Sequence, residues 1–155
     1  MSSEDNKNHA AFVEIVSVIG FALESPEFKN LVTALREHPL VSVEDRLTFC
    51  DFSQHGLECV LISSKIEHVL FIVNTDSTES GKIKPYRANF LCGVESGDTR
   101  AQVLAKFTAA KITPTECEAE FAIFKVEGFQ LYFSFVNENR NAAISVVEVR
   151  RIHDA

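Results

Sequence analysis

Tryptophan is absent from this chain of 155 residues, and methionine occurs once. The core must therefore be built largely from aliphatic residues and the thirteen phenylalanines. Long apolar runs are missing too, because the best candidate, residues 11–23, is too short to cross a bilayer and contains Glu14. The first ten residues are polar and partly acidic, unlike the basic start of a signal peptide. We therefore expect a cytoplasmic protein that does not enter a membrane.

Closely spaced metal ligands are also absent. The five histidines are scattered, and no two of the four cysteines form a C-x-x-C pair. A structural zinc site needs such pairs, so we expect no metal and no cofactor. We interpret Cys50, Cys59, Cys92 and Cys117 as reduced residues that fill small spaces in the core.

Basic residues are outnumbered by acidic ones, 15 against 22, which gives a net charge of −7. Nucleic acid is an unsuitable partner for such a chain, because its phosphates attract clustered lysine and arginine. A basic protein partner is compatible with this charge, since complementary fields accelerate encounter. Solubility alone is the other explanation of the acidity.

Motifs of catalysis are missing as well. The sequence contains no G-x-S-x-G elbow, complete phosphate-binding loop, G-x-G-x-x-G or H-E-x-x-H. Asp51, Ser53 and His55 lie close together and suggest a triad. On a strand, however, these three side chains would point the same way instead of converging on one point. We predict no catalytic residues and a protein that is not an enzyme.

Two stretches of the chain share one pattern of helix and strands. A first helix is predicted in "SPEFKNLVTALRE", residues 25–37, where Ser25 can cap the helix and Pro26 occupies its first position. A second helix is predicted after Thr99, which forms a capping-box spacing with Gln102. A further helical spacing of apolar residues begins at Phe12, and a strand is the alternative there because several of these residues are β-branched. The alternating patterns predict strands at 45–52, 57–63, 66–74, 118–126, 129–136 and 142–151.

These stretches align without a gap from position 28 to position 61, and Gly56 falls on Gly128. Beyond the longer second hairpin loop, Ile66, Val69 and Phe71 match Ile144, Val147 and Val149. The alignment predicts internal repeats over about 25–74 and 96–152, joined by a polar connector at 75–90. We therefore predict a single α+β domain, 1–155, of two tandem repeats preceded by an N-terminal helix. Each repeat would be a helix with a three-stranded antiparallel meander, in one long sheet or two apposed sheets with helices on one side.

Three carboxylates alternate at the start of the predicted strand 118–126. Glu116, Glu118 and Glu120 would project from one face of that strand. Two interpretations are open for this arrangement. It can be a solvated face or a charged guard on an exposed sheet edge. Alternatively, it is an acidic patch that binds a basic partner.

Two motifs carry a resemblance to known proteins. The stretch "FLCGVESGDTRAQVLAKF" and the later "EGFQLYFSF…ISVVEV" hairpin resemble the helix-plus-meander module of β-lactamase inhibitory protein and of small outer-membrane assembly lipoproteins. The whole of residues 12–152, with "HGLECVLI" and "KPYRANFLCG", is similar to small bacterial immunity proteins encoded beside polymorphic or contact-dependent toxins. That resemblance implies a cytoplasmic protein that binds and blocks one cognate toxin.

Our leading hypothesis is therefore an immunity protein that occludes a toxin's active site, with acidic residues facing a basic cleft. An acidic type III secretion chaperone is the alternative, although such chaperones typically close with a helix and this chain is predicted to end in a strand. A small enzyme with an unrecognised site is the third hypothesis, and it would need a pocket lined by His55 or His68. The identity of the toxin and the oligomeric state stay open at this level.

Overall fold

The computed structural model describes residues 12–74, 83–136 and 142–152 and contains helices together with one antiparallel sheet. The predicted connector 75–90 thus lies partly outside the described residues. The helices are α2 (Phe12–Val16), α3 (Pro26–Leu35), the short 3-10 helix η2 (Leu91–Gly93) and α4 (Arg100–Ala109). The strands are β1 (Leu40–Glu44), β2 (Leu47–Phe52), β3 (Leu57–Ile62), β4 (Lys65–Ile72), β5 (Glu116–Cys117), β6 (Phe121–Val126), β7 (Phe129–Phe135) and β8 (Ile144–Arg151).

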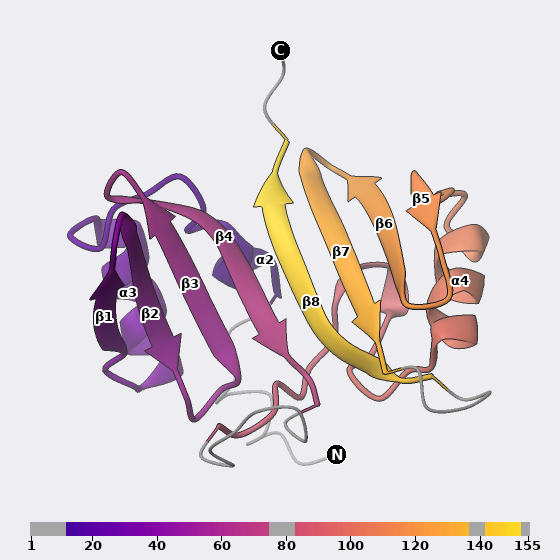
Figure 1. The fold of residues 1–155 in the computed structure, drawn as a ribbon, viewed down its shortest axis with the longest axis horizontal. Coiled ribbons are helices and arrows are strands. Elements are labelled where there is room, and N and C mark those ends of the chain that lie inside the picture. The colour runs from indigo at the N-terminus through magenta and orange to yellow at the C-terminus, as the bar shows by residue number, and fades with distance from the viewer. Residues whose placement is uncertain (1–11, 75–82, 137–141, 153–155) are drawn as a thin grey trace.

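All eight strands belong to one sheet, in the order β1-β2-β3-β4-β8-β7-β6-β5 (Figure 1). Each half of the chain forms a meander of neighbouring strands, and the two meanders meet where β4 pairs with β8. In this central ladder Val69 lies opposite Val149, and Phe71 lies opposite Val147. The last strand therefore returns to the middle of the sheet, and β1 and β5 form its two edges.

The prediction of an α+β fold with antiparallel strands is confirmed, but the expected number of six strands is wrong. The predicted strand 45–52 begins only at Leu47, because Asp45 has a positive φ of 56° and forms a turn with Arg46. The preceding residues form the unpredicted strand β1. The predicted strand 118–126 likewise begins at Phe121, after a turn that separates it from β5.

The helices begin where the sequence places their caps. The Ser25 side chain accepts a hydrogen bond from the Phe28 N–H at 3.2 Å, and Pro26 occupies the first turn of α3. At α4 the expected capping box forms, since Thr99 and Gln102 bond each other's backbone N–H reciprocally. The N-terminal helix α2 is shorter than its apolar spacing predicts, and a turn follows Val16.

Phenylalanines connect the helices to one face of the sheet. Phe28 of α3 contacts Phe52 of β2, and Phe107 of α4 stacks on Phe124 of β6 with ring centroids 3.8 Å apart. Phe12 of α2 contacts Phe71 of β4 on the same face. The interpretation of the cysteines as core residues is correct for the buried Cys50 and Cys59, whereas Cys92 is half-buried and Cys117 is exposed. All four are free thiols.

Candidate binding surface

The helices leave the second face of the sheet uncovered. Because side chains alternate along a strand, Ala122 and Phe124 of β6 enter the core, whereas Phe121 and Ile123 point to the opposite side. Neither of these two residues belongs to the buried core. Among the described residues, no helix packs on this side of the sheet (Figure 1). We call it the open face.

Two aromatic rings stack on the open face near the β5 edge. Phe121 of β6 and Tyr132 of β7 lie with ring centroids 5.2 Å apart and ring planes inclined by 9°. Ile123 lies directly opposite Tyr132 in the β6–β7 ladder. All three side chains are half-buried, so solvent still reaches part of their surface. We call these three residues the aromatic patch.

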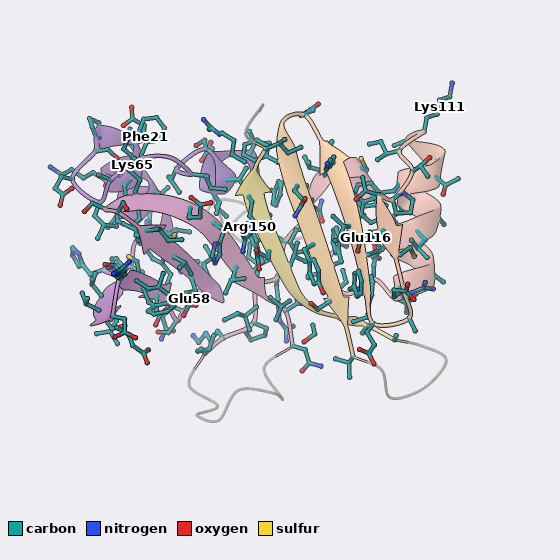
Figure 2. The ribbon with its side chains drawn as sticks, turned by 45° about the horizontal axis from the view of Figure 1, so that its top comes forward. Phe21, Glu58, Lys65, Lys111, Glu116 and Arg150 are labelled. Atoms are coloured by element: carbon teal, nitrogen blue, oxygen red, sulfur yellow. The ribbon has the colours of Figure 1, made fainter. Side chains whose placement is uncertain are left out.

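Carboxylates flank the aromatic patch on both sides. Glu116 of β5 lies opposite Ile123, and Glu148 of β8 lies opposite Tyr132. Glu148 forms an ion pair with Arg150, which belongs to the same strand. Figure 2 shows Arg150 near the middle of the sheet and Glu116 over its second half. An apolar centre with acidic borders can receive a partner that has both apolar and basic groups.

The three predicted partner-binding residues are all exposed, but they do not share one strand face. Glu116 belongs to β5, whereas Glu118 and Glu120 lie in the connection to β6. The Glu118 N–H donates to the carbonyl of Phe121 at 2.8 Å and closes this turn. The expected row of carboxylates on one strand is therefore wrong, because the chain reverses direction between them. They form an acidic border around the sheet edge instead.

Hydrogen bonds from α4 hold the chain segment that carries the acidic border. The Arg100 guanidinium donates to the carbonyl oxygen of Glu118 and to the Cys117 sulfur, both at 3.1 Å. Arg100 is the first residue of α4, so the turn is tied to the capped start of a helix. Sequence reasoning did not identify this contact, since eighteen residues separate Arg100 from Glu118. The acidic border is thereby held in a defined position.

Two further carboxylates lie on the open face in the first half of the sheet, on β2 and β3. Asp51 of β2 lies opposite Glu58 of β3. Burial, followed by a hydrogen bond and charge repulsion from Asp51, raises the pKa of Glu58 to about 8. Glu58 therefore keeps its proton to a higher pH than an exposed glutamate does. Figure 2 shows Glu58 on the half of the sheet opposite Glu116.

His68 lies on the open face between these regions, opposite Val60 and Arg150. Burial lowers its pKa, Glu148 and Glu67 act in the opposite direction, and Arg150 adds to the lowering. Its ring is therefore predominantly neutral at pH 7. The centre of the open face thus combines a neutral imidazole with the Glu148–Arg150 ion pair, in contrast to the acidic border beside β5.

The residues first weighed as a triad form a structural anchor. The Glu37 carboxylate, just after α3, accepts hydrogen bonds from the Ser53 hydroxyl at 3.4 Å and the Gln54 N–H at 3.2 Å. It also lies 2.9 Å from Nδ1 of His55. Asp51 is directed to Glu58 on the neighbouring strand instead. Glu37 was missed from the sequence because nothing local links it to a turn far along the chain.

Other chemistry finds little support in the described parts of the chain. Burial raises the pKa of the Cys50 thiol to about 12 and raises that of Cys59 as well, so both are poor nucleophiles. No group of three or more histidine, cysteine or carboxylate side chains there could hold a metal ion. In the same described residues, each helix is too short or too polar to span a membrane.

Comparison with known proteins adds no relative. The chain matches no family profile, no curated protein and no solved structure.

Proposed function

We propose that this protein is an immunity protein that binds a cognate bacterial toxin and occludes the toxin's active site. The observation that supports this proposal best is the stacked pair of Phe121 and Tyr132 on a sheet face that no described helix covers. Aromatic side chains that keep part of their surface in contact with solvent on a sheet face are typical anchors of protein interfaces. The immunity-protein resemblance of the sequence motifs supports the same function.

In this mechanism the aromatic patch supplies most of the affinity. Phe121, Ile123 and Tyr132 lose their remaining contact with water when an apolar surface of the toxin covers them. Glu116 then lies at the rim, where it faces basic groups beside the toxin's active site, whereas Glu148 is paired with Arg150 of its own strand. The net charge of −7 accelerates the encounter with such a basic cleft. The complex forms in the cytoplasm and inhibits the toxin stoichiometrically.

We also propose that the two halves are copies of one helix-plus-meander unit, which would account for the width of the sheet. The alignment that matches Val69 with Val147 and Phe71 with Val149 exchanges the two central pairs of the β4–β8 ladder. An exchange of the halves therefore maps this ladder onto itself. Each copy acquires an additional short strand at its outer edge, β1 or β5. Joining two units side by side creates an open face broad enough to cover an active-site groove.

A pull-down from the native host tests the function. Tagged protein is expected to capture one stoichiometric partner encoded beside it, which is toxic when produced alone and harmless when the two are produced together. Tyr132→Ala should weaken capture by at least about 30-fold, corresponding to the loss of a hot-spot side chain. Phe49→Ala, which changes an aromatic residue at the far end of the same face, is the matched control and should leave capture unchanged. A neighbouring protein that is harmless alone contradicts the proposal.

The secretion chaperone is the competing function. Its support would be a helix at 142–152, but these residues form β8 and its flanks. The same pull-down distinguishes the two functions, because a chaperone would capture a secreted effector through an unfolded N-terminal segment. A truncated effector that lacks this segment would then fail to bind, whereas a toxin's folded catalytic domain would be sufficient for an immunity protein.

A further inference from the structure

The β1 strand is an apolar strand at an unpaired edge of the sheet. All five of its residues are exposed, and β2 is its sole neighbour among the described strands. Leu40 and Val43 each retain 72% of their accessible surface, and Val41 retains 48%. An exposed edge of this composition is a template for pairing with another strand.

The hairpin geometry determines which backbone groups of β1 are free. Glu44 and Leu47 close a two-residue turn, so they form a hydrogen-bonded pair. Because hydrogen-bonded residues alternate along an antiparallel ladder, Leu40, Ser42 and Glu44 bond to β2. The N–H and C=O groups of Val41 and Val43 consequently point outward, away from the sheet.

The opposite edge of the sheet, β5, is shorter than β1 and bordered by charged instead of apolar side chains. The β5 strand has only two residues, and the exposed Glu116, Glu118 and Glu120 surround it. Short length and charge are the usual means by which proteins prevent edge-to-edge association. The β1 strand contains neither proline nor lysine, and its pairing with β2 shows no register shift. One edge is thus protected and the other is not.

We propose that β1 pairs in antiparallel fashion with β1 of a second copy of this chain, around a twofold axis at Ser42. In this register Val41 lies opposite Val43 of the second copy, and the outward backbone groups of both residues are satisfied. The arrangement is self-complementary, since each copy supplies the same two valines. Glu44, the sole charged residue of the strand, lies opposite Leu40 of the second copy and far from the other Glu44.

Neighbouring registers fit less well. A twofold axis at Val41 would place Pro39 opposite Val43, and proline has no N–H to donate. An axis at Val43 would bring Asp45 into the ladder, although its positive φ of 56° belongs to the turn. The Ser42 register avoids both difficulties. It also leaves the aromatic patch free at the other end of the sheet, so toxin binding and pairing of copies are compatible.

Sedimentation velocity over a wide concentration range tests the pairing. The native chain should reach the mass of two copies as its concentration rises, and Val43→Lys should shift the midpoint of association to at least about tenfold higher concentration. Glu116→Lys places the same side chain at the other edge and should leave the association unchanged. A native chain with single-copy mass throughout, or a dimer that Val43→Lys does not weaken, overturns the proposal.

Cross-linking tests the register directly. Ser42 of the two copies would form a non-hydrogen-bonded pair, whose Cα atoms are about 4.5 Å apart, within reach of a disulfide. In a Cys92→Ser, Cys117→Ser background, mild oxidation of Ser42→Cys should therefore give a covalent dimer. Leu40→Cys should give little, since residue 40 faces residue 44. Equal cross-linking at both positions, or none at residue 42, overturns the register.

Capture of the toxin by these variants distinguishes the pairing of copies from the proposed immunity function. Val43→Lys should still capture the toxin, because the aromatic patch is unchanged. Loss of capture in this variant would overturn pairing between copies and would indicate that a strand of the toxin occupies β1. Loss of capture in Tyr132→Ala alone leaves the pairing of copies unaffected.

Discussion

The two halves of this protein present similar strands to the sheet, but they differ in what surrounds those strands. The first half ends in an apolar edge, β1, and the second ends in the short, acid-bordered strand β5. Stacked aromatic residues lie on the open face of the second half, whereas the first half carries the Asp51 and Glu58 pair there. A shared pattern of buried residues therefore specifies a scaffold, and the exposed positions of each half are free to specify different contacts.

The two aligned glycines show the same difference in the interior. Gly56 and Gly128 both adopt a positive φ, +65° and +86°, before β3 and β7. A Cβ at Gly56 would lie 2.4 Å from the Tyr86 nitrogen and 2.8 Å from the Ile72 carbonyl oxygen. A Cβ at Gly128 would have no neighbour within 4 Å. The backbone near Tyr86 crosses close to the first turn, whereas no described residue approaches the Gly128 Cβ position in this way.

The largest expected effect separates these two glycines. Gly56→Ala should lower the free energy of unfolding by about 3 to 5 kcal/mol, because backbone atoms must move in addition to the strain of a positive φ. Gly128→Ala should cost only about 1 kcal/mol, from the backbone conformation alone. Chemical denaturation of both variants provides the measurement. Equal losses would contradict the close approach of Tyr86 to Gly56.

The second largest effect concerns the pH dependence of stability, which should depend on Glu58 beside Asp51. The folded-state pKa of Glu58, about 8, lies above its ordinary value of 4.5, so the folded protein holds this proton more tightly than the unfolded chain. Its contribution is complete below about pH 4.5 and is lost as the pH rises to about 8. Solvent reaches part of the carboxyl group, so we expect a loss of about 1 to 2 kcal/mol over this range.

Glu58→Gln should remove this part of the pH dependence. The variant's stability relative to the native chain should therefore rise by the same amount between pH 5 and pH 8, as measured by denaturation at several pH values. The lowered pKa of His68 favours folding as the pH rises through its range, but it is present in both proteins and largely cancels in the difference. A difference that does not change with pH would contradict the protonated Glu58.

The smallest expected effect concerns the helix of the second half. Thr99→Ala removes the side-chain oxygen that accepts from the Gln102 N–H, at a cost of about 1 kcal/mol. Thr99→Ser keeps this oxygen and should change the stability by no more than a few tenths of a kcal/mol. Thermal unfolding of the two variants provides the comparison. A Thr99→Ala variant as stable as the native chain would show that tertiary packing alone maintains this end of α4.

Local patterns predicted the elements whose determinants are close in sequence. The caps at Ser25 and Thr99 and the alternation in β7 and β8 led to correct helices and strands. The boundaries of β2 and β6 were missed, because turns at Asp45 and Glu118 interrupt sequences that otherwise continue to alternate. Of the candidate site, the acidic residues were identified correctly as exposed, but their arrangement was not.

The sequence by itself determined the α+β class, the phenylalanine-rich core and the scarcity of catalytic motifs, because periodicity and composition are local properties. Only the tertiary structure decided that β8 returns to pair with β4, that Phe121 and Tyr132 stack on the open face, and that Tyr86 closes over Gly56. Each of these contacts joins residues whose positions depend on how the whole sheet is assembled. Pairing between distant strands is governed by their common burial, which no short stretch of sequence specifies.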